Sequence, residues 1–194
     1  MASFINLDSF YRDREVYPNE NSYQVDARQT ETWFAAARTT MVVAQNPSIK
    51  PREFATTVNI RYLSLPYTDD LAEMPIVFIN FHSKEFKDIH LISSINGVQI
   101  DAKFVCRFDK IQNDRNGDPM WIHYQCNMEQ TMRFKRGDPV VLSITTRSGN
   151  ILPQQDTDVP TDADPTKQSQ ITFEITPYIN DADYSNHTTT PFSF

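Results

Sequence analysis

Short runs of alternating apolar and polar residues are the feature that most constrains this chain. Apolar and polar residues alternate in TTVNIRYLSL, from Thr56, and again in QITFEIT, from Gln170. A period of two places the apolar side chains on one face of a strand. PIVFINF, from Pro75, is apolar at nearly every position, which is typical of a strand buried on both faces. The sequence therefore predicts β-strands at all three places.

Similar runs predict further strands and one hairpin. HLISSINGVQI, from His90, contains Asn96-Gly97, the preferred dipeptide of a two-residue hairpin turn. Four more runs fit strands, namely AKFVCRFDKI, MWIHYQC, QTMRFK and PVVLSITTR, which begin at residues 102, 120, 130 and 139. No amphipathic helix separates these runs, which favours antiparallel pairing. About eight short strands predict an all-β sandwich or barrel.

Composition divides the chain into three parts. Residues 1–32 are predicted to be an extended N-terminal arm that includes the first strand, at Tyr23 to Val25. Residues 33–180 are predicted to form the β domain. Its acidic loop, 154–170, has prolines and no apolar face, so we expect it to be exposed and mobile. Residues 181–194 are predicted to form a C-terminal tail. The stretch TWFAAARTTMVV, from Thr32, is compatible with a helical turn or with a strand.

The charge distribution argues against nucleic acid as a partner. The net charge is −7, and seven acids against Lys167 alone give residues 150–194 a balance of −6, so the rest of the chain sums to about −1. Binding to phosphates needs a basic face, which this balance does not provide. No secretory signal follows Met1 and no apolar stretch approaches the roughly 20 residues of a membrane span, so we expect synthesis in a reducing, cytosol-like compartment.

Residue patterns that carry chemistry are scarce. The sequence has no G-x-S-x-G motif and no phosphate-binding glycine loop. His123 and Cys126 are three apart, which puts them on opposite faces of a strand and argues against a shared metal. Cys106 and Cys126 are equally far from Asn116, which predicts that they face each other across two strands as buried thiols, with a disulfide left open. We therefore predict no enzyme and no catalytic, cofactor-binding or metal-binding residues.

Apolar residues outside the predicted strands suggest binding to other proteins. Aromatic-rich extensions dock on their own domain or on another chain. In the arm, the predicted partner-docking residues are Phe4, Ile5, Leu7, Phe10, Arg12, Arg14 and Tyr17. In the C-terminal tail they are Tyr184, Phe192 and Phe194.

The N-terminal segment also resembles a known viral family. Leu7-Asp8-Ser9, Arg12-Asp13, Tyr17-Pro18-Asn19 and Ser22-Tyr23-Gln24-Val25 look like a segment near the N-termini of virion proteins of nucleocytoplasmic large double-stranded DNA viruses. VNIRYLSLPY, PIVFINFHS and PVVLSITT are similar to strands of the same proteins. The chain thus resembles their single jelly-roll minor capsid proteins, including the penton-type ones. The resemblance implies a jelly roll, two four-stranded sheets packed face to face.

The same resemblance implies a structural role in a virion. A minor capsid protein would be made in the host cytoplasm, would enter the capsid shell, and would cement or bridge capsomers of the major capsid protein. Its expected partners are that protein and other minor capsid proteins. A homo-oligomer, and contact with a membrane through the inner capsid layer, are left open.

Two alternatives are kept. One is a penton protein at the fivefold vertex, which must form five-membered rings. The other is a β-sandwich carbohydrate-binding module, for which Trp33, Tyr67 and Trp121 are candidate aromatic contacts.

Overall fold

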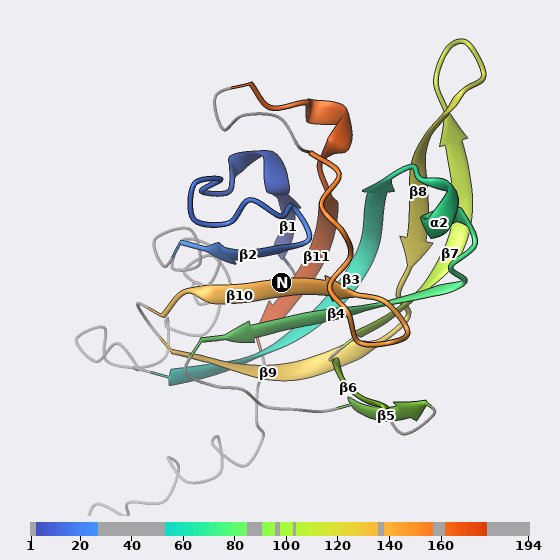
Figure 1. Cartoon of the computed structure of the whole chain (residues 1–194). Coiled ribbons are helices and arrows are strands. Elements are labelled where there is room, and N and C mark those ends of the chain that lie inside the picture. The colour runs from blue at the N-terminus through green and yellow to red at the C-terminus, as the bar shows by residue number, and fades with distance from the viewer. Residues whose placement is uncertain are drawn as a thin grey trace, which may run out of the picture.

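The computed structural model describes residues 3–26, 53–84, 91–95, 98–102, 104–135, 138–156 and 162–177. These residues form eleven strands: β1 (Ser3–Asp8), β2 (Ser22–Val25), β3 (Glu53–Pro66), β4 (Ile76–Ser83), β5 (Leu91–Ile95), β6 (Val98–Ala102), β7 (Phe104–Asn113), β8 (Pro119–Gln125), β9 (Glu129–Lys135), β10 (Val140–Thr145) and β11 (Gln170–Pro177). Three short helical elements accompany them: η1 (Ser9–Tyr11), α2 (Asp69–Ala72) and η3 (Pro165–Lys167). Figure 1 shows their arrangement.

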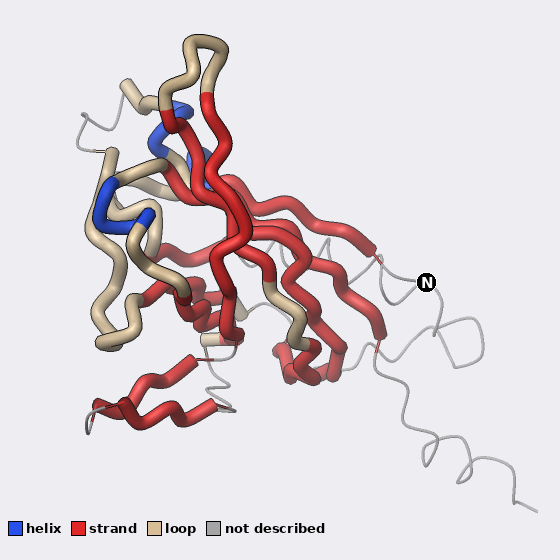
Figure 2. The backbone as a smooth tube through the Cα atoms, turned by 90° about the vertical axis from the view of Figure 1, so that its right-hand side faces the viewer, coloured by secondary structure: helices blue, strands red, loops and turns tan. Residues whose placement is uncertain are grey.

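Nine of these strands form one curled antiparallel sheet. Its order is β1-β11-β3-β8-β7-β4-β10-β2, and β9 also pairs with β3. The other two strands, β5 and β6, form a separate hairpin, set apart from the main sheet in Figure 2. The all-β antiparallel fold predicted from the alternating runs is therefore confirmed.

The strands of the main sheet pair in a nested order along the chain. β1 pairs with β11, β2 with β10, β3 with β9, and β4 with β7. The first strand thus meets the last, the second meets the last but one, and so on inward. A chain folded double and then wound in this way makes a jelly roll with two Greek keys. β5 and β6 are an insertion at the innermost turn.

The winding gives two halves that face each other. One half is β1-β11-β3-β9 and the other is β2-β10-β4-β7, with β8 bridging β3 and β7. Phe81 of β4 stacks on Phe173 of β11, with ring centroids 4.5 Å apart. Phe81 also makes an edge contact with Phe134 of β9, at 6.0 Å. One apolar core therefore joins the two halves, which are a single sheet continuous through β8 rather than two separate sheets.

Strand β3 is long because two strands, β9 and β8, pair one after the other along the same edge of it. Its first part pairs with β9, from Glu53↔Lys135 to Asn59↔Glu129. Its last part pairs with β8, from Leu63↔Tyr124 to Pro66↔Trp121. The pairing shifts by one residue between the two parts, so β8 and β9 act as one strand with a break. Met132, Phe134, Ile122 and Tyr124 consequently all reach the core.

Two expectations, one about the N-terminal segment and one about the acidic loop, differ from the structure. Residues 3–8 are a strand of the sheet, and β1 and β2 are both end strands of the sheet, so this part of the N-terminal segment belongs to the domain. Asp156, Gln168 and Ser169 of the predicted exposed loop are buried, because they pack against the N-terminal segment. The stretch from Thr32 lies outside the described residues.

Candidate functional site

The N-terminal segment turns sharply after β1. Asp8 begins the turn because its Oδ1 accepts a hydrogen bond from the Phe10 amide, at 2.9 Å. Ser9 then anchors the turn on the start of β11. Its Oγ donates to Gln168 Oε1 at 3.0 Å and accepts from the Ser169 amide at 2.9 Å, and its amide donates to the Ser169 carbonyl. Asp-Ser of the N-terminal motif is therefore a fold-forming pair.

Arg12 closes this turn from the inside. Its Nε donates to the Tyr17 carbonyl at 2.9 Å, and its Nη2 donates to the Pro18 carbonyl at 2.6 Å. Nη1 donates to the Ser9 carbonyl at 2.8 Å and to Gln168 Oε1 at 2.6 Å. The planar, forked guanidinium can satisfy acceptors on several sides at once. The loop from Ser9 to Pro18 is thus folded around one buried side chain.

Two buried carboxylates neutralise the arginines of the segment. Glu20 Oε2 lies 4.0 Å from Arg12 Nη2, and Asp156 Oδ2 lies 3.8 Å from Arg14 Nη1. Burial raises the pKa of Glu20, while the Gln155 amide and Arg12 oppose that rise. Gln168 Nε2 donates to Asp156 Oδ2 at 2.5 Å. We call Ser9, Arg12, Glu20, Asp156 and Gln168 the arginine network. It ties the N-terminal turn to the segment before β11.

Tyr17-Pro18-Asn19 leads the chain from this network into β2. Asn19 Oδ1 accepts from the Asn21 amide at 2.8 Å, and Asn19 Nδ2 donates to the Leu152 carbonyl at 2.9 Å. Glu20 is connected as well, since its carbonyl accepts from Ser169 Oγ at 2.7 Å. The motif residues therefore direct β1 and β2 into opposite halves of the sheet.

The predicted docking residues of the arm fall into two groups. Ile5 and Leu7 are buried in the core, and Arg12 is buried in the arginine network. They are only 7–8% exposed and offer a partner almost no surface in this fold, whereas the sequence analysis predicted that they dock on a partner. Ile5 and Leu7 are two apart, as on one face of a strand, but the apolar Phe4 beside them hides this spacing in the sequence.

The other arm residues are at least partly accessible. Phe4 is 68% exposed and Phe10 is 36% exposed, while Tyr17 is half-buried against the core. Arg14 lies over the Phe10 ring, 4.9 Å from its centroid. For these four residues docking stays a prediction. Tyr184, Phe192 and Phe194 lie outside the described residues.

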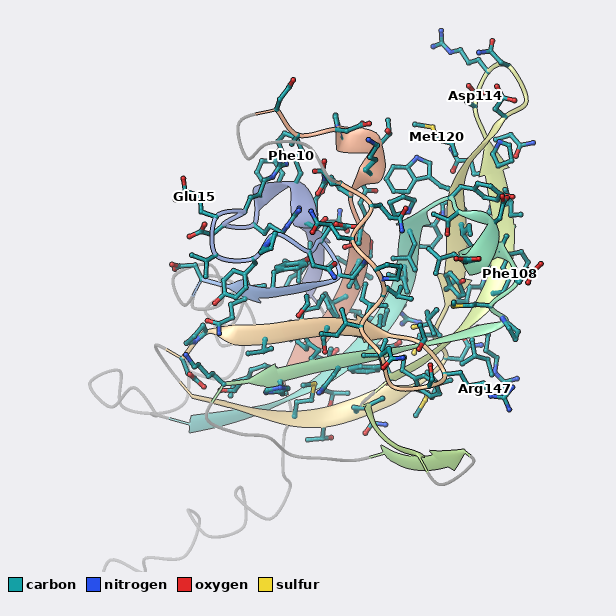
Figure 3. The ribbon with its side chains drawn as sticks, in the orientation of Figure 1. Phe10, Glu15, Phe108, Asp114, Met120 and Arg147 are labelled. Carbon is teal, nitrogen blue, oxygen red and sulfur yellow. The ribbon has the colours of Figure 1, made fainter. Side chains whose placement is uncertain are left out.

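The turn after β1 exposes two large apolar residues that the sequence analysis missed. Tyr11 is 78% exposed and Val16 is 60% exposed. The rings of Tyr11 and Phe10 meet edge to face, with centroids 5.3 Å apart. We call Phe10, Tyr11 and Val16 the exposed turn. Figure 3 shows Phe10 and Glu15 together on one side of the molecule, far from Phe108. No period distinguishes these residues in the sequence, because they lie in a turn.

A histidine cluster on β3, β7 and β8 is the arrangement closest to catalytic chemistry. His123 Nδ1 lies 2.6 Å from Tyr62 Oη and 3.0 Å from Ser64 Oγ, and its Nε2 lies 2.8 Å from Gln112 Oε1. Gln112 can only accept at this oxygen, so Nε2 carries the proton and Nδ1 accepts from the hydroxyls. Burial lowers the pKa of His123, which favours this neutral form.

The geometry of this cluster differs from that of a nucleophilic catalytic site. A serine hydrolase orients its base with a carboxylate and exposes the serine to substrate. Here an amide takes the place of the carboxylate, and Ser64 and His123 are each only 3% exposed. The ring also packs against Tyr62 in a tilted arrangement, with centroids 4.9 Å apart. The cluster therefore links three strands on the outer face of the sheet.

The two cysteines lie where the sequence placed them. Arg107↔Gln125 and Phe108↔Tyr124 are paired, so the same register brings Cys106 opposite Cys126. Both are buried free thiols. The contact with Cys126 and burial raise the pKa of Cys106 well above its ordinary value. The prediction of buried cross-strand thiols is confirmed.

Comparisons with known proteins give no family for this chain. No family model matches the sequence, and no curated protein matches it significantly. Among the described residues, no group of three or more His, Cys, Asp or Glu side chains could hold a metal ion. None of the helices in the described ranges is long and apolar enough to cross a membrane.

Proposed function

We propose that this chain is a structural minor capsid protein of a large icosahedral DNA virus. In this role it cements or bridges capsomers of the major capsid protein. The observation that carries the proposal is that the N-terminal motif, Leu7 to Val25, directs the first strands into the two halves of a jelly roll. The motif and the jelly-roll winding are both features of the family that the sequence resembles. A jelly roll by itself hosts many functions, so the motif adds the necessary second argument.

The surfaces of the domain suit a bridging role. β1 and β2 are end strands of the sheet, so each has one edge without a partner among the described residues. Edges of this kind accept an added strand from another chain. Phe4 points outward from β1 and is 68% exposed. Phe4 and the exposed turn therefore offer apolar anchors close to an edge that has no partner among the described residues, and many copies in a shell make weak single contacts sufficient.

Incorporation into virus particles tests the proposal. Phe4→Ser and Phe10→Ser change exposed side chains, so the double variant should fold with little loss of stability. We expect its copy number per purified particle to fall severalfold, measured by quantitative mass spectrometry. The matched control is Phe108→Ser, which alters a residue 40% exposed on another side of the molecule. Absence of the unaltered chain from purified particles would contradict the proposal. Equal incorporation of the double variant and the control would show that the N-terminal surface is not needed for incorporation.

A carbohydrate-binding module is the second candidate, favoured by one feature of the outer face. Tyr62 and Trp121 are half-buried there, and Gln112 is exposed opposite Trp121. Aromatic rings beside amides are typical of sugar-binding surfaces. Tyr67 donates to Asp69 Oδ1 at 3.1 Å, and Trp33 lies outside the described residues. A glycan array on which the chain binds nothing would eliminate this candidate.

A further inference from the structure

The exposed turn is displayed on a rigid base. Arg12 fixes the turn from inside through four hydrogen bonds, and Ser9 fixes it to the start of β11. The Tyr17 amide donates to the Asp13 carbonyl at 2.7 Å, and the Val16 amide donates to Asp13 Oδ1 at 3.2 Å. Such bonds remove conformational freedom before any partner binds. An apolar anchor that is already ordered loses less entropy on binding.

Several acidic residues lie in and near the exposed turn. Asp13 and Glu15 lie within it and are exposed. Asp162 and Asp164 lie in the segment that precedes Gln168, and Gln168 touches Ser9 and Arg12. Hydrogen bonds from Thr166 lower the pKa of Asp164, so this carboxylate is charged at neutral pH. Asp13 and Glu15 therefore place negative charge within the turn, and Asp162 and Asp164 lie in a segment that is bonded to it through Gln168.

The positive charges near the turn are already paired. Arg12 is buried, and Arg14 contacts Asp156, the Phe10 carbonyl and the Phe10 ring. Lys167 lies 3.7 Å from Asp164. A partner that approaches the exposed turn consequently meets aromatic surface with an acidic rim.

We propose that the exposed turn inserts into an apolar pocket rimmed by lysine or arginine on a different protein. Charge complementarity selects this occupant over the others. The chain carries a net charge of −7, so a second copy would bring more acid to the same surface. Anionic lipid and nucleic acid would be repelled in the same way. The inference rests on the proposed function, because it names the chemistry of the capsid partner.

Site-specific photocrosslinking in assembled particles tests this pairing. A benzophenone amino acid replaces Tyr11, which is 78% exposed, and in a control chain it replaces Phe108. We expect the probe at position 11 to form one main product with a single other virion protein. The crosslinked peptide should contain apolar residues and at least two lysines or arginines within its pocket. The probe at position 108 should not give this product.

A charge series sharpens the test. Glu15→Lys should lower the yield of the product at least about threefold, and Glu15→Gln should lower it less, because the rim loses its complementarity in steps. Crosslinks to a second copy, to lipid or to nucleic acid would overturn the inference. An unchanged product yield with Glu15→Lys would also overturn it. The absence of any crosslinked product in particles that contain the chain would do the same. Particles that lack the chain altogether would instead overturn the proposed function, and this inference with it.

Discussion

The guanidinium of Arg12 is buried, yet its donors meet three backbone carbonyls and one side-chain amide oxygen. Hydrogen bonds to a charged donor are stronger than bonds between neutral groups. Burial lowers the pKa of this guanidinium, and the Glu20 carboxylate opposes that change. The burial of Arg12 is therefore compensated only while all of its hydrogen-bond acceptors stay in place.

Replacing Arg12 should therefore destabilise the fold strongly. Arg12→Met leaves Glu20 buried without its positive neighbour and removes four hydrogen bonds, so we expect a loss of about 3–5 kcal/mol in the free energy of unfolding. Urea denaturation followed by circular dichroism measures it. Arg12→Met with Glu20→Gln should be less destabilised than the single variant, because the unpaired charge is gone. Arg61→Met is the control, because Arg61 is 53% exposed in its ion pair with Glu174, and it should cost less than about 1 kcal/mol. Equal losses for Arg12→Met and Arg61→Met would contradict the role of Arg12.

His123 should make stability depend on pH. Burial and Lys110 lower its folded pKa, whereas the unfolded chain titrates near the ordinary value of about 6.5. Between these two values the unfolded state binds more protons, so stability rises with pH there. The contribution is fully present above about pH 6.5 and is lost as the pH falls toward the folded pKa.

The variant His123→Phe isolates this effect. We expect the unfolding free energy of the natural chain to fall more steeply from pH 7 to pH 5 than that of the variant, by at most about 1.4 kcal/mol per pH unit. Denaturant titrations at several pH values give both slopes. Parallel slopes would show that His123 does not titrate in this window.

The residue scale also shows where sequence reasoning stops. Cys106 and Cys126 could be paired from their equal distance to one loop, because a hairpin makes contacts predictable from spacing. The contacts of the arginine network could not be predicted from spacing, since Gln168 lies 156 residues from Arg12 in the chain. Contacts of that range depend on the winding of the whole sheet. Arg12 therefore looked like a surface charge in the sequence and is buried in the fold.

At the scale of elements, long alternating runs were enough to find most strands. β3 and β11 keep a period of two along much of their length, and β4 is apolar almost throughout. β1 is different because only Ile5 and Leu7 face the core, and Phe4 is apolar on the solvent side. Two inward residues are too few to establish a period, so the strand was taken for part of an arm.

β1 should be required for folding. Ile5 and Leu7 are 8% and 7% exposed, and truncating a buried aliphatic side chain to alanine costs about 2–5 kcal/mol. We expect Ile5→Ala and Leu7→Ala to lower the unfolding free energy by amounts toward the low end of this range, since the strand lies at the sheet edge. Phe4→Ala is the matched control on the opposite face, and it should change stability by less than about 0.5 kcal/mol. Thermal denaturation of the three variants compares them directly. A chain that lacks residues 1–20 and still folds normally would contradict this prediction.

At the scale of the whole molecule, nested pairing makes the two ends of the chain interdependent. β1 pairs with β11, and the arginine network joins the same two regions, although they are separated by most of the sequence. β2 and β10 close the other half in the same manner. Neither half can be completed by a continuous piece of chain. The domain should therefore behave as a single cooperative unit rather than as two sheets that open separately.

A cavity at the contact between the halves tests this cooperativity. Phe173 is fully buried in β11 and stacks on Phe81 of β4, so Phe173→Ala should cost about 3–5 kcal/mol. If the halves unfold together, amides of β9 and of β10 should lose protection by the same free energy, although the two strands belong to different halves. Hydrogen exchange with mass spectrometry of peptides from both strands measures this. Ile151→Ala, at a residue 47% exposed, is the control and should leave both unchanged. A loss confined to β9 would mean that the halves open independently and that the shared core does not couple them.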